Sequence, residues 1–138
     1  MKVEGIDHVH AYTKNLEKAV SVFGPLLGID FYPTFDASDY GARAAYNPLG
    51  FEFVEPNDPN GLAARAFAGA KEGDLCISLK VPDIEEAIAE MESKGMKLLA
   101  RMQIGKLKEA AFETSQTCGV MIELCEYPGS DIALAAVS

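Results

Sequence analysis

The sequence predicts an α+β fold in which two repeated β-α-β-β-β modules form a curved mixed sheet around a cavity, with the helices outside. The first observation is an internal repeat: residues 6–20 and residues 74–88 share the same order of alternating strand positions, helix-capping residue and early glutamate. The second is that residues 51–55 and 122–126 each read as a strand that carries a glutamate between apolar neighbours. Each module has room for two more strands, so both copies contain the same elements.

The first module begins with a strand whose alternation places Val9 and Ala11 on one face, away from its polar and aromatic residues. A helix is predicted over Leu16 to Leu27, because Asn15 can cap its first turn and Gly28 fits a left-handed C-terminal cap. The other strands of this module are expected to begin at residues 29–32 and to cover residues 39–47 and 51–55.

The second module repeats these elements. Asp83 is the expected N-cap of a helix over Ile84 to Lys94, and Gly95 ends it. Its other strands are expected to begin at residues 96–99 and to cover residues 109–115 and 122–126. Glu55 and Glu126 fall on the opposite parity from the glutamates at the centre of the final strands, and are predicted to be surface charges at strand ends.

The chain of 138 residues is expected to form a single domain. Module one is placed at 1–56, a linker at 57–73, module two at 74–127 and a tail at 128–138. The linker contains a turn followed by an Ala-rich stretch, residues 62–70, that predicts a short helix. The tail is small and apolar, and is predicted either to fray or to pack against a partner.

Composition excludes several classes of protein. Twelve Lys plus Arg against 21 Asp plus Glu give a net charge of -9, which disfavours nucleic acid and anionic membranes as partners. No apolar run reaches the ~20 residues that span a bilayer, and residues 1–5 do not resemble a signal peptide, so a cytoplasmic location is expected. The three cysteines form no Cys-x-x-Cys pair and are expected to be reduced.

The polar faces of the strands indicate a metal site. A histidine on the first strand and a glutamate on a neighbouring strand, repeated in two copies, would bring up to four ligand positions to one cavity. Imidazole and carboxylate ligands suit divalent Zn, Fe, Mn, Co or Ni, and a thiolate at Cys76 would favour Zn or Fe. The alternative explanation is that Glu52 and Glu123 face solvent, because antiparallel sheets often have one exposed side.

Three segments, residues 6–9, 81–87 and 119–124, resemble the vicinal-oxygen-chelate superfamily, which includes glyoxalase I, extradiol dioxygenases, bleomycin-resistance proteins and methylmalonyl-CoA epimerases. The resemblance covers nearly the whole chain, and the epimerases look most similar. It implies four metal ligands: a histidine on the first strand, a glutamine or glutamate ending module one, a histidine opening module two and a glutamate on the last strand. These positions fall on His8, Glu52, Cys76 and Glu123.

The chain departs from that family pattern at two positions. Cys76 stands where the second histidine is expected, so the fourth ligand is a thiolate, a water or nothing. The acid/base glutamate that the resemblance implies on the strand before Glu52 falls at about Ala44. The possible substitutes for that glutamate are His10, Tyr46 and Tyr12, and Glu123 or His10 is expected to move the proton.

The leading hypothesis is a metal-dependent isomerase, epimerase or lyase that acts on a small oxygenated substrate, which an acyl-CoA would satisfy, through a metal-stabilised enolate. The alternative is a metal-free protein that binds a drug or metabolite, as bleomycin-resistance proteins do. Extradiol dioxygenase chemistry fits less well, because such enzymes usually keep two histidines and one carboxylate. The side chains expected to contact the substrate are Tyr12, Tyr46, Ser78, Lys80 and Met121.

A homodimer is the expected assembly. Modules of this kind expose strand edges, and the resemblance implies that these edges pair within the chain or with a second copy. The apolar stretch at residues 132–137 adds surface that a small monomer rarely leaves uncovered.

Overall fold

The computed structural model describes residues 1–138, which contain eight strands and four helices. The strands belong to one sheet in the order β2-β3-β4-β1-β5-β8-β7-β6. Pairing is parallel between β1 and β4 and between β5 and β8, and it is antiparallel in the β2–β3, β3–β4, β6–β7 and β7–β8 pairs. The predicted α+β class, with two β-α-β-β-β repeats and a mixed sheet, is confirmed.

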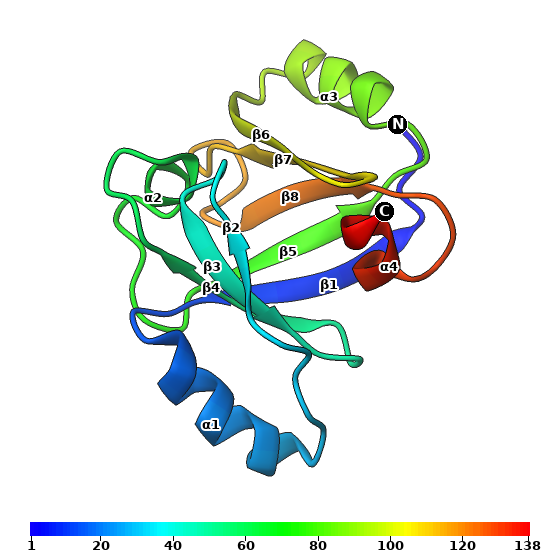
Figure 1. The fold of residues 1–138 in the computed structure, drawn as a ribbon. Coiled ribbons are helices and arrows are strands. Elements are labelled where there is room, and N and C mark those ends of the chain that lie inside the picture. Colours follow the sequence, from blue (N-terminus) through cyan, green and yellow to red (C-terminus); the bar gives the residue numbers. More distant parts are fainter. The chain divides into compact units, whose positions relative to one another are not determined.

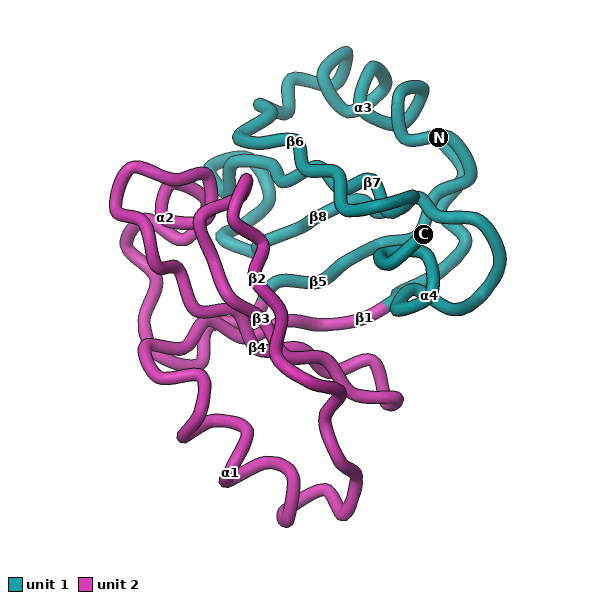
Figure 2. Tube along the Cα trace, in the orientation of Figure 1, with its two compact units in different colours: residues 1–7, 76–138 teal, residues 8–75 magenta.

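The chain divides into two compact units, which Figure 2 colours separately. Unit 1 contains residues 1–7 and 76–138, and unit 2 contains residues 8–75. The division passes through the first strand after Asp7, so that each unit keeps one of the two repeats almost whole.

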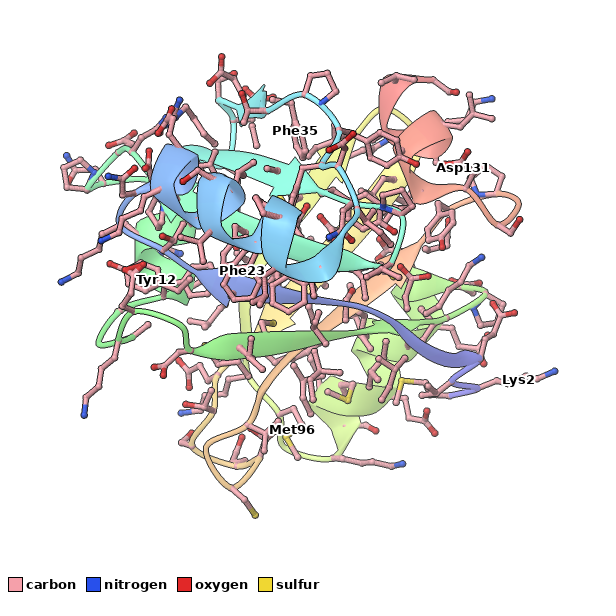
Figure 3. All side chains as sticks on the ribbon, turned by 90° about the horizontal axis from the view of Figure 1, so that it is seen from below. Lys2, Tyr12, Phe23, Phe35, Met96 and Asp131 are labelled. Carbon is pink, nitrogen blue, oxygen red and sulfur yellow. The ribbon has the colours of Figure 1, made fainter.

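Unit 2 contains the first repeat (Figure 1). Its elements are β1 (Gly5–Tyr12, from residue 8), α1 (Leu16–Leu27), β2 (Phe35–Ala37), β3 (Ala42–Tyr46), β4 (Phe51–Pro56) and α2 (Leu62–Ala66). Helix α1 contacts β3 and β4, and its Leu16 and Phe23 pack with Ala11 and Phe53 in the core. The Phe23 ring lies 4.9 Å from that of Phe53 and 5.5 Å from that of Phe51, on the sheet-facing side of the helix (Figure 3).

Unit 1 contains the second repeat. Its elements are β5 (Leu75–Lys80, from residue 76), α3 (Ile84–Ser93), β6 (Leu98–Ile104), β7 (Leu107–Phe112), β8 (Met121–Glu126) and α4 (Ile132–Val137). Helix α3 contacts β7 and β8, and its Ile84 and Ile88 pack on Phe112 and Leu124. None of the four helices has the length and apolar character that crossing a membrane requires.

The two predicted helices and their caps are confirmed. Asn15 Oδ1 accepts from the backbone N–H of Lys18, and Asp83 Oδ1 accepts from that of Glu86, each at 3.1 Å. Gly28 has φ 68°, the left-handed conformation expected after α1. These caps were predictable because they depend only on residues next to them in the chain.

The prediction that Glu55 and Glu126 are surface charges is wrong. Glu55 Oε2 accepts from the backbone N–H of Leu16 at 2.8 Å, and Glu126 Oε1 accepts from that of Ile84 at 3.0 Å. In each unit the glutamate near the end of the last strand therefore satisfies an N–H group in the first turn of the packed helix, where a negative charge is also favoured by the helix dipole.

Residues 29–32 do not form the strand predicted after α1. The strand β2 is shorter and later, at Phe35–Ala37, and Tyr32 makes a single backbone hydrogen bond to Tyr46. Pro33 follows directly and has no N–H to donate, which prevents a continuous ladder there. The second repeat also differs: β6 begins at Leu98, two residues later than predicted, and β7 covers Leu107–Phe112 instead of residues 109–115.

The tail forms a short helix that packs on its own unit. Asp131 caps α4 through the N–H of Leu134 at 3.1 Å, and Ile132 and Ala135 are buried. The helix contacts β6 and β7, and the Lys106 N–H donates to the carbonyl of Ala135 at 2.9 Å. The frayed end that was one prediction for the tail is therefore absent.

Candidate functional site

Two histidines of β1 and a glutamate of β4 meet in unit 2. His8 and His10 are two residues apart on a strand, so both side chains lie on one face. The parallel register places Glu52 opposite His10, and His10 Nδ1 lies 3.2 Å from Glu52 Oε1. Both histidines are buried and the Glu52 side chain is 16% exposed. A carboxylate at this distance orients the imidazole ring.

The three side chains have a donor set that fits a divalent metal ion. One ligand atom from each of His8, His10 and Glu52 lies within 4.8 Å of the other two. Two imidazole nitrogens and one carboxylate oxygen suit Zn, Fe, Co, Ni or Mn. Of the predicted ligands, His8 and Glu52 are therefore together, and His10, expected to carry a proton, lies with them.

Aromatic side chains border this cluster within unit 2. The ring of Tyr46 meets that of His8 edge-on at 6.1 Å, and the ring of Phe67 lies 5.7 Å from that of His10. The centres of the Tyr12 and Phe67 rings lie 5.5 Å apart. Of the two tyrosines predicted to contact substrate, Tyr46 therefore lies next to His8, and Tyr12 lies next to Phe67. Phe67 follows the short helix α2, and no sequence pattern in that linker distinguishes it from core residues.

Unit 1 has a buried polar contact at the corresponding place. Ser78 lies opposite Glu123 in the β5–β8 register, as His10 lies opposite Glu52. The Ser78 hydroxyl donates to Glu123 Oε1 at 2.9 Å, and Glu123 is only 2% exposed. Glu123 is therefore buried and hydrogen bonded, and the alternative explanation that this side chain faces solvent is wrong.

Glu109, on β7 of unit 1, is a polar residue that the sequence interpretation missed. It is 8% exposed, and a carboxylate oxygen of Glu109 lies within 4.8 Å of one from Glu123. It was expected only as the first residue of a strand. A comparison of the two repeats by strand register would have identified it, because the position is polar in one copy and apolar in the other.

The remaining predicted site residues have identifiable places in unit 1. Cys76 is buried on β5 opposite Met121, and it belongs to none of the His, Cys, Asp and Glu groups whose ligand atoms lie within 4.8 Å. Lys80 Nζ donates to the Gly129 carbonyl at 2.6 Å and lies 3.9 Å from the centre of the Tyr127 ring. Burial raises the pKa of the Cys125 thiol far above its usual range, so this side chain is a neutral thiol.

A model of the glyoxalase/bleomycin resistance protein/dioxygenase superfamily matches residues 7–112. Because the match covers most of the chain, the protein belongs to this superfamily. The resemblance drawn from the sequence motifs is confirmed at this level.

Among solved structures, similar folds include several methylmalonyl-CoA epimerases. A Streptomyces coelicolor epimerase variant in complex with 2-nitronate-propionyl-CoA has a TM-score of 0.78 and 20% identity, over 94% of this chain and 99% of that one. The Mycobacterium tuberculosis epimerase has a TM-score of 0.77 and 22% identity, over 97% and 93%. A hypothetical protein from Bacillus halodurans has a TM-score of 0.76 and 20% identity, over 91% and 96%. A comparison with curated proteins found no significant match.

Proposed function

We propose that the protein is a metal-dependent isomerase, epimerase or lyase of the vicinal-oxygen-chelate type, acting on a small oxygenated substrate through an enolate. The observation that carries this proposal is the cluster of His8, His10 and Glu52, whose ligand atoms lie within 4.8 Å of one another on buried strand faces. Two imidazole nitrogens and a carboxylate oxygen are ligands that a divalent cation of this kind prefers.

An acyl-CoA is the substrate class that we favour. Neighbours with this fold are solved with 2-nitronate-propionyl-CoA and with methylmalonyl-CoA. In a 2-carboxyacyl thioester one carbon lies between the thioester carbonyl carbon and the carboxylate carbon, so an oxygen of each group could bind a single cation. The proton on that carbon is also acidified by both groups, so the same binding mode prepares the bond that must break.

The residues of this chain have distinct roles in the proposed reaction. His8 and Glu52 would hold a divalent ion such as Zn, Co, Mn, Ni or Fe(II). Such an ion, when bound, supplies Lewis-acid stabilisation of the negative charge on a substrate oxygen. Glu123 and His10 are the candidates to move the proton, and Glu52 sets the orientation of the His10 ring.

The predicted substrate contacts divide into two groups. Tyr46 borders His8 and Tyr12 borders Phe67, and each presents aromatic surface with a hydroxyl group, which suits an acyl chain with polar ends. Ser78 and Lys80 already bond to Glu123 and to the Gly129 carbonyl, so we propose that they position these partners. Met121 is half-buried beside Cys76 in the strand register and would offer an adaptable apolar contact.

The second candidate function is a metal-free protein that binds a drug or metabolite. Two observations favour it: Ala44 carries no proton-transfer group, and Cys76 stands where the family resemblance implies a ligand histidine. This protein would bind an acyl-CoA or another small molecule without exchanging its protons or changing any bond.

We further propose a homodimer in the cytoplasm. Leu134 and Val137 of α4 are 62% and 82% exposed, which leaves apolar surface next to the buried side of that helix. All three cysteines are free, as expected in a reducing compartment. Light scattering of the untagged protein at micromolar concentration should give twice the monomer mass of 14.8 kDa, and a monomer that persists on concentration would contradict the dimer.

Proton exchange tests the proposed function. Protein loaded with Co²⁺ or Zn²⁺ is incubated with methylmalonyl-CoA in D₂O, and loss of the α-proton is followed by NMR. We expect rapid exchange with the wild type, loss of exchange in Glu52→Ala, which removes the ligand oxygen, and wild-type exchange in Glu55→Ala, a carboxylate of the same strand that caps α1. Tight acyl-CoA binding without exchange at any metal loading would instead support the metal-free binding protein.

A further inference from the structure

Glu109 is a buried carboxylate that none of the roles above uses. It lies on β7 opposite Cys125, two positions beyond Glu123 on β8, and only 8% of its surface is exposed. A carboxylate oxygen of Glu109 lies within 4.8 Å of one from Glu123. Glutamate is among the side chains least often buried in proteins, so a buried glutamate at this position calls for an explanation.

The first repeat shows that the fold does not need a carboxylate at this position. In unit 2, Ala44 lies on β3 opposite Val54, two positions beyond Glu52 on β4. Ala44 is therefore the register equivalent of Glu109, and it fills the same place with a methyl group. The first repeat forms the same strand pairing with alanine at this position, so the pairing does not require Glu109. This indicates that the side chain of Glu109 has a chemical role.

We propose that Glu109 is a catalytic proton-transfer residue, a role that rests on the function proposed above. Its carboxylate takes the proton from the carbon next to the substrate carbonyl. The C–H bond breaks, its electron pair forms the enolate, and Glu109 becomes a carboxylic acid. In the reverse step the enolate carbon takes a proton back from Glu109 or, when the configuration inverts, from a second acid. Exchange with water then restores the starting protonation of each group.

Glu123 and Ser78 support this role through their fixed positions. The Ser78 hydroxyl donates to one oxygen of Glu123, which holds that carboxylate on β8 beside β7. Glu109 and Glu123 thus lie in one unit, on adjacent strands with an antiparallel register, and their relative position does not depend on a loop. A proton-transfer group on a strand is held more precisely than one on a flexible segment.

The test is Glu109→Gln, which keeps the size and hydrogen-bonding capacity of the side chain but removes its basicity. Exchange of the α-proton of methylmalonyl-CoA in D₂O is measured by NMR with Co²⁺-loaded protein. We expect a fall in kcat of about 100-fold or more, the usual contribution of a proton-transfer group. KM and Co²⁺ affinity should stay within about twofold of the wild type. Glu113→Gln, just after the end of β7, is the matched control and should exchange at the wild-type rate.

Two other variants guard against loss of folding. Glu109→Asp keeps the carboxylate on a shorter side chain and should retain partial exchange. Glu109→Ala introduces the residue that the first repeat has at this position, and urea unfolding should show a stable protein that does not exchange.

Each remaining outcome overturns the role of Glu109. Exchange by Glu109→Gln within about threefold of the wild type excludes it. A parallel loss of exchange and of Co²⁺ affinity shows that Glu109 acts on cation binding instead. If the wild type shows no exchange with any metal, the proposed function itself fails and takes this role with it, so the two failures are distinguishable.

Discussion

The two repeats have the same architecture but different polar chemistry. In each, a residue on the first strand faces a glutamate on the last strand: His10 faces Glu52 in unit 2, and Ser78 faces Glu123 in unit 1. The first pair is an imidazole and a half-buried carboxylate, whereas the second is a hydroxyl and a fully buried one. The backbone geometry that creates the contact has therefore been kept, while the side chains have changed.

The difference extends to the neighbouring positions. Unit 2 has His8 where unit 1 has Cys76, and unit 1 has Glu109 where unit 2 has Ala44. Imidazole side chains are thus confined to unit 2, and the second buried carboxylate to unit 1. This teaches that repeated modules can share the contacts that hold helix and sheet together while the polar residues on their strands differ.

The largest expected effect separates His8 from its repeat equivalent. His8→Ala removes a nitrogen ligand and should weaken Co²⁺ affinity by more than the 10- to 100-fold that altering an outer-shell partner costs. Cys76→Ser should leave affinity unchanged, because Cys76 is in none of the ligand-atom groups. Isothermal titration of the apo variants measures both. A lower Co²⁺ affinity in Cys76→Ser would show that the Cys76 thiolate is a ligand. Cys76→His tests whether the histidine that the family has at this position raises the affinity.

The next prediction compares how much the Ser78–Glu123 and His10–Glu52 contacts contribute to stability. Ser78→Ala removes a hydrogen-bond donor from a fully buried carboxylate, so the free energy of unfolding should fall by about 1–3 kcal/mol. Glu52→Gln changes a half-exposed side chain and should cost less than about 1 kcal/mol. Urea unfolding of both variants gives the two values, and a larger loss for Glu52→Gln would reverse the comparison.

A smaller effect tests the glutamates that cap the packed helices. Glu126→Ala and Glu55→Ala should each lower the free energy of unfolding by about 0.5–2 kcal/mol, since each leaves an N-terminal N–H of a helix without its acceptor. Glu55→Ala should cost more, because Glu55 also accepts from Arg43 Nη2 at 3.0 Å. The control is Glu92→Ala on the exposed side of α3, expected within about 0.5 kcal/mol of the wild type. Equal losses of unfolding free energy in Glu126→Ala, Glu55→Ala and Glu92→Ala would show that the two caps do not stabilise the protein.

The smallest expected effect concerns acid sensitivity. The Thr13 hydroxyl, at 2.6 Å, and the Lys14 N–H hold the pKa of Glu72 below its ordinary value of 4.5. A lowered pKa means that this carboxylate stabilises the fold above about pH 4.5, and that the stabilisation is lost as pH falls through the lowered value. Thr13→Val should therefore lower Tm at pH 7, with the difference shrinking below pH 4.5.

An exposed ion pair of unit 1 should respond to salt. Arg101 donates to Glu85 at 2.6 Å and lowers the pKa of that exposed carboxyl. Since both side chains are in solvent, Arg101→Gln should change Tm little, and 0.5 M NaCl should remove what difference there is. A Thr13→Val effect that also vanished in salt would show that the Glu72 contact is equally exposed.

Local sequence features predicted much of the fold. The helices begin and end where Asn15, Gly28 and Asp83 indicate, because a cap depends on backbone groups within a few residues of it. The strand at residues 29–32 was wrong for the opposite reason: strand formation requires a partner at matching register, and Pro33 withdraws a donor that the apolar pattern does not reveal.

The candidate site was predictable in part. The alternation of the first strand placed His8 and His10 on one face, and the repeat identified Glu52 and Glu123 as equivalent. The contact between His10 and Glu52 was not expected, because it follows from the parallel register of β1 and β4, and residues 11–50 separate these strands.

The sequence by itself determined the repeat, the helices with their side-chain caps and the superfamily. These depend on short-range periodicity and on motifs that can be recognised in a single sequence. The tertiary structure alone decided which polar groups meet: Glu55 and Glu126 at the helix N-termini, His10 on Glu52, and Glu109 near Glu123. The physical reason is that hydrogen bonds and ligand geometry require distances of a few ångströms, and these distances are set by register between strands far apart in the chain.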